Sequence, residues 1–195
     1  MAKRLDGKKV AILVADGFEQ VEMTEPRKAL EAAGAKTEIV SPAHEEVRGW
    51  NHDDKADGFP VDMPLNKARS DDYDALLLPG GVRNPDQLRM LTRAVEFTDG
   101  FFAAGKPVAA ICHAPWTLIE AGVVKGKTLT SWPSLKTDLK NAGANWVDRA
   151  VVVDSGLVTS RKPDDIPAFN KKMIEEFAEG SHANKSQPAA KGRPA

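Results

Sequence analysis

Short apolar runs alternate with longer segments of helical spacing along most of this chain. Buried strands are predicted at residues 9–14, 36–40, 74–78 and 108–111. Helices are predicted at residues 24–33, 85–104 and 134–142, from Pro115 onward, and at 164–179. Two further apolar runs, at residues 151–154 and 157–159, predict a hairpin. This alternation predicts an α/β fold with a mostly parallel sheet and helices on both faces.

Two segments lie outside this pattern. Residues 42–72 are polar, interrupted by prolines and without periodicity, so an irregular connection is predicted there. Residues 181–195 are rich in Ala, Pro, Lys and Gly and predict a disordered tail. The chain has 195 residues, of which 42% are hydrophobic, enough for one full core. Residues 1–180 are therefore predicted to form a single domain.

Charge and cysteine content narrow the function classes. Lys and Arg number 27 against 28 acidic residues, so the formal net charge is -1 and no strong field favours nucleic acid or an anionic membrane. No apolar run approaches the length that crosses a bilayer. A single cysteine forms no intramolecular disulfide, and the first residues do not resemble a signal peptide. We expect a cytoplasmic protein without nucleic-acid or membrane partners.

The single cysteine, Cys112, lies between a predicted strand and a predicted helix. Residues 108–111 are apolar and follow Pro107, and Pro115 suits the first turn of a helix. This turn places the thiol at the carboxyl end of a strand, before a helix dipole that lowers a thiol pKa, so Cys112 is a candidate nucleophile. A packed core cysteine is the alternative interpretation. Because adjacent turn residues usually point apart, we expect His113 to face a substrate or a neighbouring subunit instead of the sulfur.

Two other loops follow predicted strands and so meet Cys112 at the same edge of the sheet. Gly80 and Gly81 follow the strand at 74–78, and their N–H groups, with that of His113, are a candidate oxyanion hole. A plain glycine turn is the alternative. Glu22 follows the first strand and is a candidate hydrogen-bond partner of Cys112, although glutamates at helix starts are commonly solvated.

Other motif-like strings do not carry chemistry. Residues 100–106 imitate a phosphate-binding loop, but Pro107 replaces the required Ser or Thr, and residues 122–128 are one residue too short for that motif. Acidic and histidine side chains between His44 and Asp54 have irregular spacing, so a solvated loop is favoured over a metal site. We expect neither a metal nor a cofactor.

Four motifs together strongly resemble the PfpI family of the DJ/PfpI superfamily. They are Gly-Phe-Glu-Gln-Val-Glu at 17–22, Leu-Leu-Leu-Pro-Gly-Gly at 76–81, Ala-Ile-Cys-His-Ala-Pro at 110–115 and Leu-Thr-Ser-Trp-Pro at 129–133. The superfamily includes peptidase-like proteins, bacterial general stress proteins and a deglycase. The resemblance implies a flavodoxin-like three-layer sandwich with a nucleophile elbow at Cys112, related to the class I glutamine amidotransferases.

The resemblance also implies roles for particular residues. Cys112 matches the nucleophile, His113 the histidine that follows it, and Glu22 the glutamate that contacts the cysteine, with Glu19 beside it. In peptidase-like members an acidic residue of the adjacent protomer completes the set. Asp86 is the candidate here, with a shorter side chain and one extra residue of spacing. Ala114 replaces a frequent glycine, and Trp116 adds bulk near the pocket.

Histidines occur only at 44, 52, 113 and 182, so the late histidine of glutaminases is missing. We therefore expect a stress-response cysteine hydrolase, deglycase- or glyoxalase-like or peptidase-like, acting on a small carbonyl or peptide substrate. The alternative is a non-catalytic redox sensor or chaperone-like protein with an oxidisable Cys112. By resemblance, the protein forms a homodimer or a higher homo-oligomer.

Overall fold

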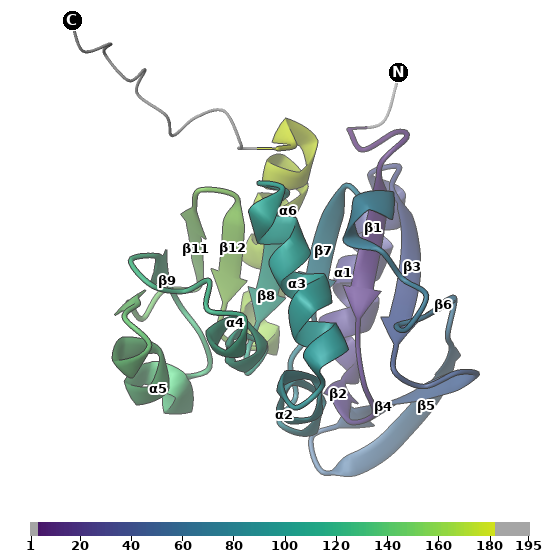
Figure 1. Ribbon diagram of the computed structural model, residues 1–195, viewed down its shortest axis with the longest axis horizontal. Coiled ribbons are helices and arrows are strands. Elements are labelled where there is room, and N and C mark those ends of the chain that lie inside the picture. Colours follow the sequence, from purple (N-terminus) through teal and green to yellow (C-terminus); the bar gives the residue numbers. More distant parts are fainter. Residues whose placement is uncertain (1–3, 182–195) are drawn as a thin grey trace, which may run out of the picture.

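A computed structural model describes residues 4–181 and shows a seven-stranded sheet in the order β11-β12-β8-β7-β1-β3-β6 (Figure 1). Its strands are β1 Lys9–Leu13, β3 Lys36–Ser41, β6 Met63–Pro64, β7 Ala75–Leu78, β8 Val108–Ile111, β11 Val151–Asp154 and β12 Leu157–Ser160. Neighbouring strands are parallel except β11 and β12, which form the predicted hairpin.

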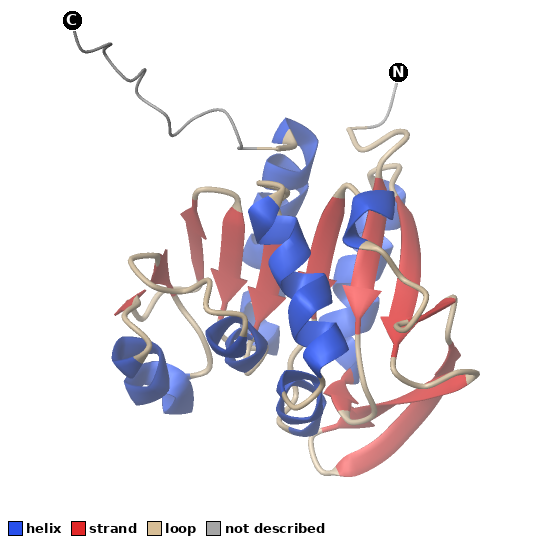
Figure 2. Ribbon diagram, in the orientation of Figure 1, coloured by secondary structure: helices blue, strands red, loops and turns tan. Residues whose placement is uncertain are grey.

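Helices cover both faces of this sheet (Figure 2). One face carries α2 Arg83–Arg89, α3 Thr92–Ala103 and α4 Pro115–Glu120, and the other carries α1 Gln20–Ala32 and α6 Ile166–Glu179. The central strands are buried on both faces; all four residues of β8, for example, have no exposed surface. Two apolar clusters result, one on each side of the sheet. The predicted three-layer α/β fold is confirmed.

Several short elements complete the structure. Two small sheets contain β2 Phe18–Glu19, β4 Glu46–Asn51 and β5 Asp54–Pro60 in one, and β9 Thr128–Leu129 and β10 Asn145–Trp146 in the other. The remaining helices are α5 Lys136–Asn141 and three single 3₁₀ turns, η1 Ser70–Asp72, η2 Pro133–Leu135 and η3 Pro163–Asp165.

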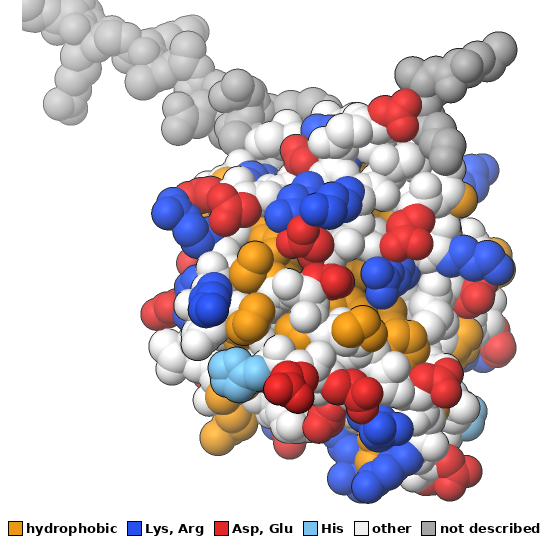
Figure 3. Space-filling model, turned by 90° about the vertical axis from the view of Figure 1, so that its right-hand side faces the viewer, with side chains coloured by type: hydrophobic (Ala, Val, Ile, Leu, Met, Phe, Trp, Pro, Cys, Tyr) orange, Lys and Arg blue, Asp and Glu red, His pale blue; other side chains and the backbone are white. Residues whose placement is uncertain are grey.

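The prediction for residues 42–72 was wrong, because β4, β5, β6 and η1 lie in this segment. The β4–β5 hairpin buries Val47 in the core and packs Phe59 against Phe18, but most of its other residues are at least partly exposed and are held by pairing. The side-chain amide of Gln20 both donates to the Asp57 carboxylate and accepts from the Asp57 N–H. Figure 3 views the molecule from the side of the β6 edge and shows Lys and Arg side chains, with acidic neighbours, at its lower end, where this hairpin lies. A mostly polar hairpin of this kind gives no regular apolar pattern in the sequence.

Helix boundaries also differ from the predictions. The helix predicted at 85–104 is two helices, α2 and α3, because Leu91 adopts an extended backbone between them. The first helix begins at Gln20, four residues before the predicted start at Thr24, and has no side-chain cap that could have marked it. The predicted tail lies outside the described residues except for Ser181, whose hydroxyl donates to the carbonyl of Ala104.

The segment that imitates a phosphate-binding loop has a structural role. Its last residue, Lys106, donates from Nζ to the carbonyl oxygens of Ser70 and Tyr73 at 3.0 and 2.7 Å, and so supports the turn that leads into β7. Among residues 4–181, no helix is long and apolar enough to span a bilayer.

Candidate active site

Cys112 sits directly after β8, in a backbone conformation that few non-glycine residues adopt. Its φ is 63°, in the left-handed region. Two backbone hydrogen bonds hold it there: its N–H donates to Ser160 at 3.1 Å, and its carbonyl accepts from Trp132 at 2.9 Å. Strained backbone of this kind persists where surrounding structure enforces it, and it is concentrated at functional sites. The predicted strand-to-helix elbow is therefore present.

Glu22 reaches the elbow from the first turn of α1, which packs on the opposite face of the sheet from α4. Its side chain has no exposed surface, and its Oε2 accepts a hydrogen bond from the N–H of Gly80 at 3.0 Å. A side chain at Gly80 is impossible without movement, because a Cβ there would lie 2.5 Å from Glu22 Oε2 and 2.6 Å from the Cβ of Cys112. Glycine at this position therefore brings the glutamate and the cysteine together.

His113 contacts the sulfur directly. Its Nδ1 lies 3.1 Å from Cys112 Sγ, so the expectation that the two side chains point apart was wrong. The left-handed backbone at Cys112 turns the thiol back toward its neighbour. The imidazole is stacked on Trp132 with the ring planes 24° apart, and the edge of Trp116 packs against it. These contacts fix the ring orientation.

Burial is the largest influence on the pKa values of Glu22, Cys112 and His113. It raises the pKa of Glu22 to about 8 and lowers the pKa of His113 to about 4, so both are neutral at neutral pH. Burial also raises the pKa of the Cys112 thiol, and the charge of an ionised Glu22 raises it further, whereas the N–H groups of Gly81 and His113 lower it. The predicted lowering of the thiol pKa was therefore wrong, because the helix that follows is only six residues long and cannot offset the loss of hydration.

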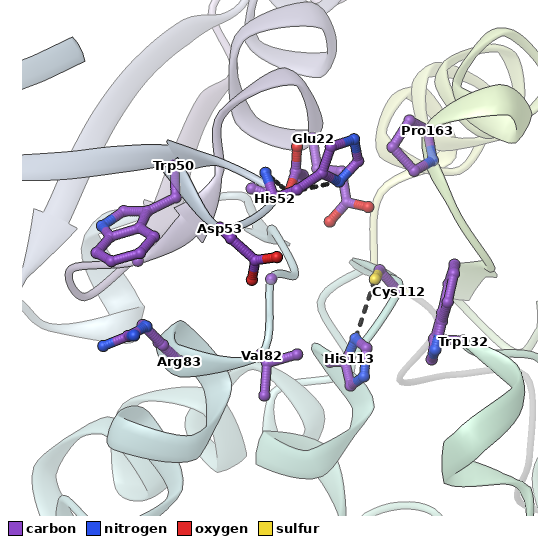
Figure 4. A pocket seen from close by; sticks show the side chains of 13 residues that line it. Glu22, Trp50, His52, Asp53, Val82, Arg83, Cys112, His113, Trp132 and Pro163 are labelled. Carbon is purple, nitrogen blue, oxygen red and sulfur yellow. Dashed lines mark hydrogen bonds and ion pairs between the residues drawn. The ribbon is translucent and has the colours of Figure 1, made fainter. Parts of the chain in front are cut away.

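A cavity of about 330 Å³ opens above the sulfur. In Figure 4, Cys112 and His113 lie next to Trp132, with Pro163 beyond, and the opposite side is formed by the β4–β5 hairpin and Arg83. The lining residues are Gly17, Glu19, Glu22, Trp50, His52, Asp53, Gly81, Val82, Arg83, Cys112, His113, Trp132 and Pro163.

The structure brings some of the predicted site residues together and not others. Glu19 lines the cavity and accepts a hydrogen bond from the N–H of His52 at 3.1 Å. Gly80 contributes its N–H to Glu22 and is not in the lining, so Gly81 and His113 remain as the backbone donors near the sulfur. Trp116 packs behind His113 and donates to Asp138 at 3.0 Å, outside the cavity lining.

Asp86 also lies outside the cavity lining of this chain. It stands on α2 with about half of its side chain exposed and binds Arg89 at 2.7 Å. Within residues 4–181 the structure records no contact between Asp86 and Cys112.

Sequence reasoning missed the hairpin side of the cavity, formed by Trp50, His52 and Asp53. Two of these residues belonged to the irregular acidic and histidine set that was weighed as a metal site. The structure divides that set, since His44 lines a different hollow, and no group of three potential metal ligands occurs among residues 4–181. A sequence signal for this side of the cavity was Trp50, a large aromatic residue next to Gly49 in a mostly polar segment.

Comparison with known proteins identifies the family that the sequence motifs resemble. The sequence profile of the DJ-1/PfpI family matches residues 8–176. "Putative cysteine protease YraA" of Bacillus subtilis is 45% identical over 168 residues, which is 86% of this chain and 96% of that protein. Many other relatives of comparable similarity are uncharacterised, such as SERP1413 of Staphylococcus epidermidis, 44% identical over 87% of this chain and 98% of that protein.

Solved structures agree with the sequence comparison. Drosophila melanogaster DJ-1beta superposes with a TM-score of 0.79 at 32% identity, over 88% of this chain and 90% of that one. An Anabaena variabilis protein with a DJ-1/ThiJ/PfpI-like domain and a ferritin-like domain gives 0.83, also at 32% identity, over 96% of this chain. This chain spans about half of that two-domain protein, 52% of its length. Sequence profile, relatives and fold agree, and the chain belongs to the DJ-1/PfpI family.

Proposed function

We propose that this protein is a stress-response enzyme that uses Cys112 to attack the carbonyl carbon of a small substrate, in the manner of a glyoxalase or deglycase. The observation that carries the proposal is the 3.1 Å contact between Cys112 Sγ and His113 Nδ1 beneath an accessible cavity. A nucleophile within hydrogen-bond distance of a base is the usual arrangement for covalent catalysis. Membership of a family with a relative named as a cysteine protease supports cysteine chemistry in general.

The first step uses the neutral state of His113. Because burial holds its pKa near 4, the imidazole carries a lone pair at neutral pH, but it is a weak base for a thiol whose own pKa is raised. It therefore accepts the thiol proton in the same step in which the sulfur adds to the aldehyde carbon of a 2-oxoaldehyde such as methylglyoxal and the carbonyl electron pair moves onto oxygen. The N–H groups of Gly81 and His113, which face the sulfur, are positioned to stabilise this oxyanion until it is protonated to a hemithioacetal.

The second stage moves two protons and adds one water. A base removes the proton from the former aldehyde carbon and a proton returns to the neighbouring carbon, while the hydroxyl proton is transferred to the former ketone oxygen, which converts the hemithioacetal to a thioester of lactate. Water then cleaves the C–S bond and returns the thiol, so methylglyoxal plus water gives lactate. Glu22, protonated at neutral pH, has an O–H that can donate to the sulfur when it is a thiolate.

The size of the cavity favours a small substrate over an extended peptide. Its volume of about 330 Å³ is near the lower end for ligand sites, and Trp50 and Trp132 flank it. An early adduct of methylglyoxal on an amine presents the same carbon and needs little more room at the sulfur. Peptide hydrolysis by the same residues is the variant that this shape favours less.

A redox sensor is the second candidate, and one specific observation favours it. Oε1 of Glu22 is buried and has no hydrogen-bond partner among the residues that the structure describes. Peroxide would oxidise the Cys112 thiolate to a sulfenic and then a sulfinic acid, with peroxide reduced to water at each step. A protonated Glu22 beside the sulfur could then donate to a sulfinate oxygen.

The deciding experiment follows methylglyoxal by proton NMR in an amine-free buffer made with D₂O. The protein is present at about a hundredth of the substrate concentration, so that only a true catalyst consumes all of it. Cys112→Ser is the matched control. Lactate formed by the wild type alone supports the proposal, and deuterium at its C2 identifies the proton-transfer step. If neither protein forms lactate while the wild type cleaves a fluorogenic peptide, the peptidase variant replaces it.

We also propose that two protomers share this site. Two large apolar side chains of the cavity lining are exposed, Val82 at 54% and Trp132 at 38%, and Met90, exposed at 79%, directly follows α2. Asp86 lies on α2, and its side chain, about half exposed and paired with Arg89, is accessible to a partner's histidine. Light scattering should give at least twice the chain mass of 21.1 kDa. A monomer at assay concentration removes the shared-site role of Asp86.

A further inference from the structure

A second hollow adjoins the Cys112 cavity. It encloses about 370 Å³ and shares three lining residues, Gly17, Trp50 and Arg83, with the cavity above the sulfur. The two spaces therefore meet at these residues. In contrast to the first, this hollow is lined almost entirely by polar and charged side chains: Asp16, Glu46, Arg48, Lys55, Arg83 and Gln87, with Gly17 and Trp50.

Arg83 stands on the boundary between the two spaces and is held on two sides. Its side-chain stem packs so closely on Gly17 that a Cβ on that glycine would lie 2.7 Å from the Cβ of Arg83. Its guanidinium group lies over the ring of Trp50, 4.3 Å from the ring centre. Figure 4 shows Arg83 and Trp50 together on the side of the cavity opposite Trp132. A guanidinium held in place in this way binds an anion with little further loss of conformational entropy.

The charges of the hollow are not balanced. Arg48 forms an ion pair with Glu46 at 2.8 Å, and the carboxylate of Asp16 accepts from the N–H of Arg48 at the same distance. Arg83 and Lys55 have no carboxylate partner within 4.0 Å among residues 4–181. Three cations against two carboxylates leave the hollow with a positive charge. Near the sulfur, by contrast, Glu19 and Asp53 are acidic and would repel an anion.

We propose that this hollow is an anion-binding subsite of the Cys112 cavity, in which Arg83 and Lys55 bind a carboxylate or phosphate of the substrate while its carbonyl carbon lies at the sulfur. The inference rests on the proposed function, because it assumes that a substrate occupies the cavity. It adds the substrate class: the preferred molecule carries an electrophilic carbon at one end and an anionic group at the other. Guanidinium groups are suited to either anion.

The test uses alkylation of Cys112, which needs a reactive thiol but no turnover. Rate constants are measured with N-iodoacetyl-6-aminohexanoate, whose carboxylate lies at the far end of a flexible chain from the reacting carbon, and with its neutral primary amide; in both reactions a C–S bond forms and iodide leaves. Their ratio corrects for any change in the reactivity of the thiol itself. We expect the ratio to fall about fivefold in Arg83→Gln, and less in Lys55→Gln, at low ionic strength. Lys140→Gln, which removes an exposed cation on α5 outside both spaces, should leave the ratio unchanged.

Two competing anions identify the group that the subsite prefers. Glutarate and inorganic phosphate are added separately to the reaction of the anionic reagent, and the stronger protector indicates a carboxylate or a phosphate. Protection should be weaker in Arg83→Gln than in Lys140→Gln. The proposal is overturned if neither anion protects, or if Arg83→Gln and Lys140→Gln give the same ratio. Failure of the NMR turnover experiment removes the proposed function but does not alter this ratio, so the two failures are distinguishable.

Discussion

The two sides of the Cys112 cavity are built in different ways. The sheet-end side, Glu22, Gly81, Cys112 and His113, consists of groups at the ends of the central strands or packed against them, and the carboxyl group of Glu22 is fully buried. The hairpin side, Trp50, His52 and Asp53, belongs to a small separate sheet, and the side chain of His52 is 86% exposed. The groups on the sheet-end side are fixed by the core, whereas the hairpin residues at the cavity are held mainly by the strand pairing of the hairpin, which is itself anchored by Val47.

We infer from this difference that the sheet-end side carries out the chemistry and that the hairpin side selects the substrate. A sulfur and its base must be held within a few tenths of an ångström of their working positions, which strand ends and a packed core provide. A surface hairpin tolerates change in sequence and is the part that adapts to different substrates. We therefore expect substitutions on the sheet-end side to lower kcat or stability, and substitutions on the hairpin side to alter KM.

The largest effect is expected from His113→Asn. Removal of the neutral imidazole takes away the base that contacts the thiol at 3.1 Å, and Glu22 beside the sulfur is protonated at neutral pH, so kcat for lactate formation should fall about 10²- to 10⁴-fold. Steady-state kinetics measure this loss, and circular dichroism checks the fold. A variant that keeps more than a tenth of the wild-type kcat would show that proton transfer does not depend on the contact with Sγ.

The next effect is expected from Gly80→Ala, which adds one methyl group to the sheet-end side. The new Cβ meets Glu22 Oε2, the Cβ of Cys112 and the carbonyl of Ile111, all within 2.7 Å, so the free energy of unfolding should fall by about 1–3 kcal/mol. Urea denaturation measures the change. Gly126→Ala is the matched control, because nothing lies within 4 Å of its Cβ and only its φ of 77° carries a cost of about 1 kcal/mol.

Alkylation by iodoacetamide separates the two glycine variants in a second way. Gly80→Ala displaces Glu22 or Cys112 and should change the rate at which the thiol reacts, whereas Gly126→Ala should not. Equal alkylation rates in both variants would mean that the close packing at Gly80 has no influence on the site.

The sheet-end side could be predicted because its signals are local. Residues 108–111 are apolar between two prolines, Pro107 and Pro115, and that pattern alone places Cys112 at the end of a buried strand. The rule that parallel strands expose their carboxyl ends at one edge then brings in Gly80, Gly81 and Glu22. The sequence could not indicate how deeply these groups are buried, and burial is what raises the thiol pKa instead of lowering it.

The hairpin side could not be predicted because its order comes from partners distant in sequence. Asp57 is positioned by Gln20, and Trp50 by pairing of β4 with β2 and by Arg83 on α2. None of these pairings leaves a periodic pattern in residues 42–72. The contact of His113 with the sulfur was missed for a related reason, since it depends on a single left-handed residue, Cys112, whose type gives no indication of that conformation.

The pH dependence of stability tests the sheet-end side through Glu22→Gln. This substitution keeps the shape of the side chain and an oxygen that accepts from the N–H of Gly80. The pKa of Glu22 is raised from 4.5 to about 8 by burial, so the unfolded chain loses this proton at lower pH than the folded one. The stability contribution of protonated Glu22 is therefore complete below pH 4.5 and is lost as the pH rises through about 8. Wild-type stability should fall over this range more steeply than that of Glu22→Gln.

Urea denaturation at pH 5, 7 and 9 compares the two proteins directly. His113 titrates in the opposite direction, because its lowered pKa makes the folded state lose stability as the pH falls from 6.5 toward 4, but it is present in both proteins and cancels in the difference. Parallel stability curves would show that Glu22 is ionised in the folded protein at neutral pH and cannot donate a proton to the sulfur.

The smallest effect is expected from a matched pair of tryptophans on opposite sides of the cavity. Trp50→Leu removes the ring under Arg83 and should raise KM about threefold with little change in kcat, because it affects ground state and transition state equally. Trp132→Leu removes the ring stacked on His113 and should lower kcat instead, since it loosens the base. If both variants change kcat alike, the hairpin positions the reacting groups as well as the substrate, and the division between chemistry and selection fails.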